Sequence, residues 1–315
     1  MAEKQLTFKE NEIIQILNKV YLSFKEGRFD EAVSLLEQAL SIDFEYADVA
    51  NALKCANFWL ERLEKLEEIN GGYERGAYIL QQWKVFNTFI SRFDNISERC
   101  LFTLKHYVFG LALTNFSSLY NENDLNDPEI LLSMGRCHKA RGNFEDAIRF
   151  MELASQQKRE DGVILCELAD CYSLVNENRA AKLFFREAFF LDPRSIELYY
   201  LESPMIQRLI TKLKNQGLSE EQLPEWIPVY GTVYGLFNVK RELRPLELGK
   251  LKQSIYQLEK ELSKEHPEQL VPRIINQYFW LIDHYVSSGE DREKIEEILR
   301  KIESIDPKVY REYIN

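Results

Sequence analysis

Apolar residues recur along most of this chain every three or four positions, a spacing that places them on one face of an α-helix. The spacing is clearest in three consecutive stretches, Val49 to Ile69, Tyr73 to Phe93 and Ile96 to Leu119, and it predicts three long helices there. Glycine and proline are scarce, at 13 and 9 of 315 residues, so few positions interrupt the pattern. The predicted fold class is therefore all-α, with further helices expected at Ser195 to Asn215, Leu251 to Leu262 and Ile274 to Val286.

The least regular segment is Ser219 to Arg244, which contains Pro224 and Pro228. From Pro228 onward the apolar positions fit a short helix, and a pair of strands is the competing interpretation. This segment could interrupt a regular array of helices.

Two neighbouring stretches share residue types at a constant offset of 34, for example Ala147 with Ala181 and Ala154 with Ala188. Alanine and glycine at such positions let two antiparallel helices approach closely, while larger residues one turn away fill the remaining space. Asp127 before Pro128 predicts a helix N-cap. A second Asp-Pro pair, Asp192 with Pro193, marks the end of the second stretch.

Residues 128 to 193 resemble the tetratricopeptide repeat family in this period and these residue types. The same turn and second helix recur in residues 13 to 44, and a degenerate copy lies at 276 to 307, where isoleucines replace the alanines. The resemblance covers roughly two-fifths of the chain and implies a solenoid of antiparallel helix pairs with expanded and degenerate repeats. We predict three regions on this basis: 1–126, 127–194 with the two regular units, and 195–315.

In this family the first helices of successive repeats line a groove that receives a partner peptide or helix. The basic clamp by which the co-chaperone branch holds a C-terminal carboxylate is missing, because the matching positions hold residues such as Leu17, Tyr21, Ser133, Val163 and Glu167. The expected groove is lined instead by Glu129, Leu132, Arg136 and Lys139 from one repeat and by Val163, Cys166, Asp170 and Ser173 from the next. The alternative is that the chain itself fills the groove, for instance with Pro224 to Phe237.

An aromatic group in the irregular segment is a second candidate contact, because aromatic side chains dominate protein interfaces. Core packing is the competing explanation for the same residues. The group comprises Trp226, Tyr230, Tyr234 and Phe237.

Charge and composition narrow the function classes. The net charge of -11 disfavours a nucleic-acid partner, because such binding depends on Lys and Arg at phosphates. Five dispersed cysteines suit reduced, buried thiols, and no apolar stretch has the length of a membrane span. We expect a cytoplasmic protein without membrane insertion.

No catalytic or metal-binding motif accompanies these helices: the four histidines are far apart, and no zinc, phosphate-loop or nucleophile-elbow signature is present. We therefore expect no cofactor and no enzymatic activity. The predicted function is a protein-binding scaffold or adaptor, an assembly subunit of a larger complex. The alternative is a sensor or carrier that encloses a small apolar ligand among Trp59, Trp83 and Phe86.

Overall fold

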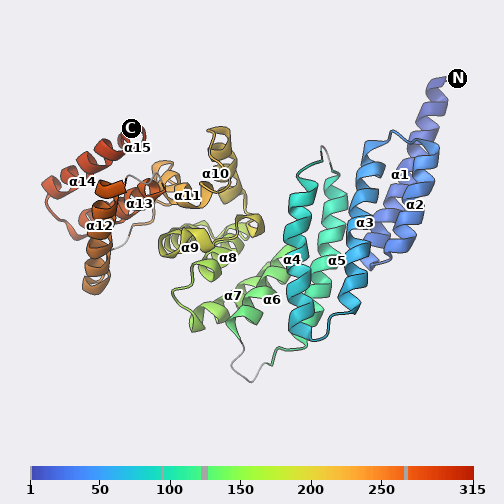
Figure 1. The fold of residues 1–315 in the computed structure, drawn as a ribbon, viewed down its shortest axis with the longest axis horizontal. Helices are drawn as coiled ribbons and strands as arrows, with labels where there is room; N and C mark the ends of the chain where they lie inside the picture. The colour runs from blue at the N-terminus through green and yellow to red at the C-terminus, as the bar shows by residue number, and fades with distance from the viewer. Residues whose placement is uncertain (1, 94–95, 122–126, 241, 266–268) are drawn as a thin grey trace. The chain divides into compact units, whose positions relative to one another are not determined.

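A computed structural model describes residues 2–93, 96–121, 127–240, 242–265 and 269–315, and every regular element in these residues is helical (Figure 1). The all-α prediction is confirmed. The chain divides into two compact units, Met1–Phe150 and Met151–Asn315, and the boundary falls inside α7 (Phe144–Gln157). The three regions expected from the sequence stay a prediction.

The first unit contains six complete helices in which each helix packs on its neighbour in sequence from α1 to α6, and α5 also packs on α1. The three long helices expected after the first repeat are confirmed as α3, α4 and α5, which lie alongside one another in Figure 1. The bounds are α1 (Ala2–Glu26), α2 (Phe29–Ile42), α3 (Ala47–Glu67), α4 (Gly72–Ile90), α5 (Glu98–Ser117) and α6 (Pro128–Ala140).

The second unit begins with two helix pairs, α8 with α9 and α10 with α11. The first helices of the pairs, α8 and α10, contact each other, and so do the second helices, α9 and α11. This contact pattern is the stacking expected of successive helix-turn-helix repeats. The bounds are α8 (Gly162–Leu174), α9 (Asn178–Leu191), α10 (Pro204–Asn215) and α11 (Leu223–Val233), with 3₁₀ turns η1 (Pro193–Ser195) and η2 (Leu198–Tyr200) between α9 and α10.

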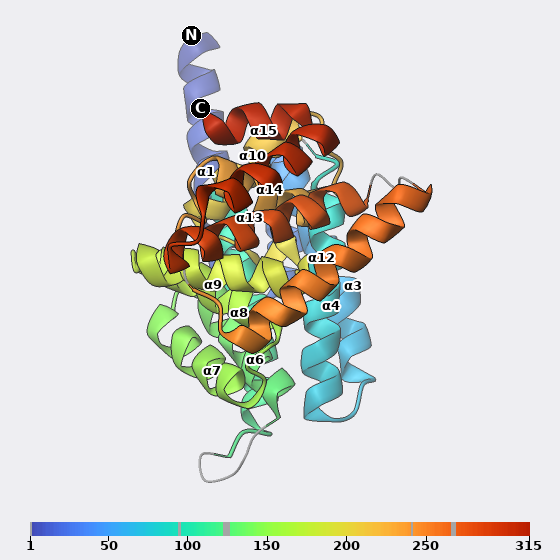
Figure 2. The same cartoon turned by 90° about the vertical axis from the view of Figure 1, so that its left-hand side faces the viewer.

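Four more helices complete the second unit (Figure 2, orange to red). Helix α13 packs on α11, α12 and α14, and α15 packs on α11 and α14. The degenerate repeat predicted at 276 to 307 corresponds to the antiparallel pair of α13 and α14. The bounds are α12 (Pro245–Glu265), α13 (Leu270–Ser288), α14 (Arg292–Ile305) and α15 (Pro307–Ile314).

Two expectations about residues 195–244 need correction. The helix predicted from Ser195 starts only at Pro204, because residues 196–203 form a connection that contains η2 and ends in extended backbone at Ser203. The strand alternative from Pro228 onward is wrong, since Leu223–Val233 is a helix that includes Pro228. The irregular segment continues the array as the second helix of a pair.

Five helix pairs share one turn geometry. In each pair a residue with a left-handed φ of 64° to 93° follows the first helix. The amide after this residue donates a hydrogen bond five residues back, to a carbonyl in the last turn of that helix, which is the Schellman motif. The left-handed residues are Gly27, Asn176, Gly142, Gly217 and Gly289, and the bonds run from Arg28 to Ser23, Glu177 to Tyr172, Asn143 to His138, Leu218 to Leu213 and Glu290 to Tyr285.

Helix N-caps confirm the expected repeat boundaries. The Asp127 carboxylate accepts a hydrogen bond from the amide of Glu129 at 2.8 Å, and Pro128 occupies the first turn of α6. Asp161 caps α8 in the same way through the amides of Val163 and Ile164, at 3.0 and 3.2 Å. Because the Asp127 bond is local, the sequence alone was sufficient to predict where α6, the first helix of the central repeats, begins.

Candidate functional site

The first half of the predicted groove belongs to α6 in the first unit. Glu129 is exposed and accepts a hydrogen bond from the Tyr73 hydroxyl at 3.2 Å, and Leu132 is half-buried. Arg136 and Lys139 retain only 8% and 2% of their surface exposure. These two cations are therefore poorly accessible, and their role in partner binding stays a prediction.

The second half of the predicted groove belongs to α8 in the second unit, where Asp170 is fully buried at 0% exposure. Its carboxylate accepts hydrogen bonds from the backbone amides of Glu202 and Ser203, both at 2.8 Å. Asp170 thus anchors the connection that enters α10. Glu202 and Ser203 therefore lie against this part of α8. Whether the chain or a partner occupies the groove stays a prediction.

The remaining α8 positions differ in accessibility. Val163 is half-buried near the start of the helix, Cys166 is buried, and Ser173 near its end is 8% exposed. Ser173 nevertheless lines a hollow described below. Of the predicted groove residues on α8, Val163 is thus the more exposed, and Ser173 is the one that lines a hollow.

The aromatic group divides into core and surface members. Phe237 is 1% exposed, and its ring centroid lies 6.3 Å from that of Phe185 and 6.0 Å from that of Phe189 on α9. Tyr230 is also buried, whereas Trp226 and Tyr234 are half-buried. Phe237 therefore packs in the core, and Tyr234 remains available at a surface.

A hollow of about 580 Å³ in the second unit brings together one residue from each predicted group, Ser173 and Tyr234. Its apolar side chains come from the last residue of α8, the first half of α10 and the turn after α11. Two exposed cations, Arg208 and Lys212, stand on α10, and the described residues that line the hollow include no carboxylate. The remaining lining residues are Leu174, Asn176, Asn178, Pro204, Met205, Leu209 and Leu236.

Polar contacts hold the Tyr234 ring in the wall of this hollow. Its hydroxyl accepts a hydrogen bond from Gln216 Nε2 at 2.9 Å and donates one to Glu312 at 3.2 Å. Lys212 Nζ lies 3.3 Å from the ring centroid, within the range of a cation–π contact. Burial raises the pKa of the Tyr234 hydroxyl, so the ring presents a neutral aromatic face beside two cations.

Sequence reasoning did not single out the α10 residues, although a signal was available. Helix α10 begins 42 residues after α8 begins, eight more than the period of 34, because η1, η2 and their flanks are inserted between the pairs. Gly217 after α10 carries the same left-handed turn as Asn176 after α8. A repeat period lengthened by eight residues would have identified α10 as the first helix of a third helix pair. It would therefore have placed α10 in the wall of the groove.

The aromatic residues proposed to enclose a small ligand pack against one another. The Trp59 and Trp83 rings stack with centroids 6.0 Å apart, and the Phe86 centroid lies 5.4 and 5.3 Å from them. All three side chains are at most 7% exposed. The rings themselves therefore occupy the space in which a carried ligand was expected.

All five cysteines are buried, and burial raises the pKa of the Cys137 thiol above its ordinary value. Within the described part of the chain, no group of three His, Cys, Asp or Glu side chains is arranged to hold a metal ion. None of the helices described has the length and apolar character needed to cross a membrane.

Comparison with known proteins locates the repeat most directly at the N-terminus. A search of curated proteins finds no match to the chain. Residues 16–46, which include the second half of α1, the Gly27 turn and all of α2, match the family model described as a tetratricopeptide repeat. Together with the stacked antiparallel pairs, this match is consistent with an all-α, tetratricopeptide-like helical repeat array.

Proposed function

We propose that this protein is a non-enzymatic scaffold that binds an acidic, amphipathic segment of another protein in the hollow between α8 and α10. A tetratricopeptide repeat suggests a protein–protein interaction scaffold, and the first helices of such repeats form the binding face. The observation that carries the proposal is the combination of an apolar floor with Arg208 and Lys212 on one wall.

Charge complementarity determines the chemistry of the expected partner. Leu174, Met205, Leu209 and Leu236 suit apolar side chains spaced along one face of a helix or extended segment. Acidic residues beside that face would pair with the two cations. The chain carries a net charge of -11, but salt screens its long-range repulsion beyond about 8 Å at physiological ionic strength, so the local cations prevail at contact.

The proposal is tested with fluorescein-labelled synthetic peptides that share one pattern of leucines and differ only in their polar residues, which are glutamate, serine or lysine. Fluorescence anisotropy with the full-length chain should rank the affinities as glutamate, then serine, then lysine. Replacing both cations, Arg208→Glu with Lys212→Glu, should weaken the glutamate peptide by about tenfold or more, because close pairs of like charge replace attractive ones.

The matched control is Lys214→Glu, which reverses one charge on the same helix, half the charge change of the double variant, at a residue outside the hollow. This variant should alter the affinity by less than about threefold, since exposed charges at a distance are screened. An equal loss in the control, or an equal affinity for the lysine peptide, would show that the hollow does not select an acidic segment.

The wider role in an assembled complex follows from the same architecture. A repeat array presents a continuous face on which several partner segments can be held in order. We infer that this chain acts as an adaptor within a larger complex. The test is quantitative: a purified partner that contains the selected acidic segment should form a complex of defined stoichiometry in analytical ultracentrifugation, and the double charge variant should abolish it.

A further inference from the structure

A second cavity, of about 510 Å³, lies within the second unit on a different set of helices from the hollow just described. The last turn of α9 forms one side of it, and α11, α12 and α13 contribute the others. Its wall combines the apolar residues Phe190 and Leu191 with the polar residues Glu225, Glu261 and Gln277. Cavities of this size accommodate small molecules.

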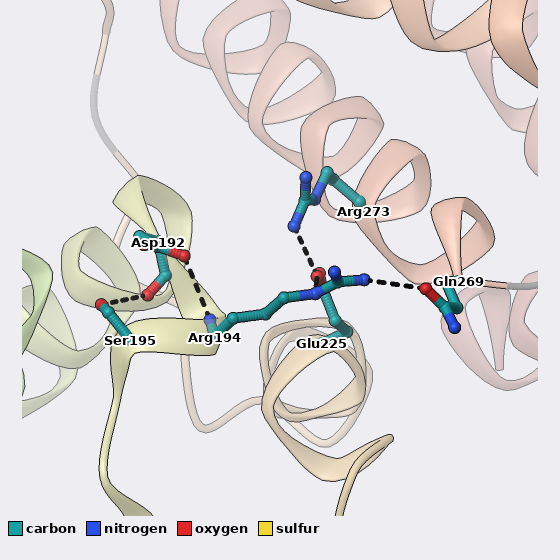
Figure 3. A network of polar contacts seen from close by, with 6 residues as sticks. All are labelled: Asp192, Arg194, Ser195, Glu225, Gln269 and Arg273. Atoms are coloured by element: carbon teal, nitrogen blue, oxygen red, sulfur yellow. Dashed lines mark hydrogen bonds and ion pairs between the residues drawn. The ribbon is translucent and has the colours of Figure 1, made fainter.

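Glu225 is the central polar group of this cavity. The residue is 4% exposed, and its Oε1 atom accepts hydrogen bonds from Arg194 Nε at 2.7 Å and from Arg273 at 2.5 Å (Figure 3). Arg194 also donates to Gln269 at 3.4 Å, and its backbone amide donates to Asp192 at 3.2 Å. Arg194 of η1 and Arg273 of α13 therefore hold the Glu225 carboxylate in one position. Gln269, the residue before α13, in turn holds Arg194.

The second oxygen of the same carboxylate has no donor. Glu225 Oε2 is buried and accepts no hydrogen bond from any residue the structure describes. Buried carboxylate oxygens are normally satisfied, and an exception points to a missing water, ion or ligand. The cavity that Glu225 lines is the place from which such a donor would come.

Gln277 provides a second acceptor in the same wall. Its Nε2 atom donates to the Ser254 hydroxyl at 2.9 Å, which leaves the buried Oε1 atom without a donor among the described residues. The end of α9 adds the negative end of a helix dipole, because the last carbonyl groups of a helix have no intrahelical partner. Two acceptor oxygens in the residues that line the cavity, Glu225 Oε2 and Gln277 Oε1, thus have no donor among the described residues.

The charges around the cavity favour a single positive charge. Three carboxylates, those of Asp192, Glu225 and Glu261, line the cavity. The two guanidinium groups beside them, those of Arg194 and Arg273, both bond Glu225, so this group carries one more negative than positive charge. We infer that the cavity binds a small primary amine, whose ammonium group donates hydrogen bonds to Glu225 Oε2 and Gln277 Oε1 and whose alkyl chain lies against Phe190 and Leu191.

Isothermal titration calorimetry of the full-length chain with three probes of equal length tests this inference. Pentylamine should bind with a Kd of about 0.1 to 1 mM, as expected for a ligand of six heavy atoms. Pentanol and pentanoate, which lack the cationic donor, should show no binding at about ten times that Kd. A crystal structure with pentylamine should place its nitrogen within hydrogen-bond distance of Glu225 Oε2.

Variants distinguish this site from nonspecific association with an acidic protein. Glu261→Gln, at an exposed position of the wall, should weaken pentylamine about threefold, and Gln277→Met, which removes one acceptor at similar volume, about fivefold or more. Glu303→Gln on α14, an exposed carboxylate outside the cavity, serves as the control and should leave the affinity unchanged.

Three results would overturn the inference: pentanoate binding in preference to pentylamine, no binding of either probe, or electron density for water alone beside Glu225. An equal loss of affinity in the Glu303→Gln control would have the same meaning. The acidic-peptide assay uses a different cavity, so either proposal can fail without the other.

Discussion

Replacing Asp170 should destabilise the second unit more than any surface carboxylate does, because this side chain is fully buried and bonded to two backbone amides. The carboxylate accepts from Glu202 and Ser203 at 2.8 Å each. A hydrogen bond to a charged group contributes about 1.5 to 3 kcal/mol, and a buried donor left without an acceptor costs a similar amount. We expect Asp170→Ala to lower the free energy of unfolding by about 3 to 5 kcal/mol.

A graded series separates the hydrogen bonds from other effects of the substitution. Asp170→Asn keeps one carbonyl acceptor and should cost about 1.5 to 3 kcal/mol. Asp306→Ala is the matched control, because Asp306 also accepts from two backbone amides, those of Lys308 and Val309 at 2.9 and 3.0 Å, but at a half-exposed helix N-cap. Loss of such a cap typically costs about 1 kcal/mol.

Two measurements check this series. Urea unfolding gives the free energies, and hydrogen exchange with mass spectrometry reports the protection of residues 196–205, which contain both amides. Exchange in this segment should rise first and most strongly in Asp170→Ala. The reasoning is refuted if Asp170→Ala costs no more than Asp306→Ala, or if the protection of residues 202 and 203 is unchanged.

Two further predictions concern other parts of the chain. Gly27→Ala should destabilise the first unit by about 2 to 3 kcal/mol in thermal unfolding, because φ is +77° and the new Cβ would lie 2.3 Å from the Tyr107 ring. Gly142→Ala, with φ of +83° and open space around it, should cost only about 1 kcal/mol, and equal costs would contradict the steric argument. Burial raises the pKa of Tyr230 and of Tyr313 to about 12, so the folded state retains phenolic protons that the unfolded state loses near pH 10. The free energy of unfolding should therefore fall between about pH 10 and pH 12. Urea unfolding across that range should show a shallower fall for Tyr230→Phe. An unchanged dependence of the unfolding free energy on pH would argue against the raised pKa.

The two proposed sites differ in the kind of helix that forms them. The hollow between α8 and α10 is a feature of the repeat architecture, since first helices of consecutive pairs lie side by side. The cavity beside Glu225 depends on α12 and α13, which belong to no regular repeat. The proposed amine site therefore rests mainly on helices outside the two regular repeats.

Local sequence determined the helices and most of the turns between them. The helical spacing of apolar residues predicted α3, α4 and α5, and the Asp-Pro pair at Asp127 predicted the start of α6, because these features depend on contacts within a few residues. The offset of 34 between matching residue types identified the two central repeats, which correspond to α6 with α7 and α8 with α9. The pair formed by α10 and α11 was missed because an eight-residue insertion moved it out of phase.

Only the tertiary structure decided what the polar side chains do. Asp170, a predicted groove residue, bonds amides 32 and 33 residues away, and Glu225 bonds Arg194 and Arg273 from segments 31 and 48 residues distant. Helical periodicity gives the face on which a residue lies but not which distant segment covers that face. Sequence alone therefore determined an all-α repeat protein, whereas the packing of distant segments decided which of its grooves remain open and which charges remain unsatisfied.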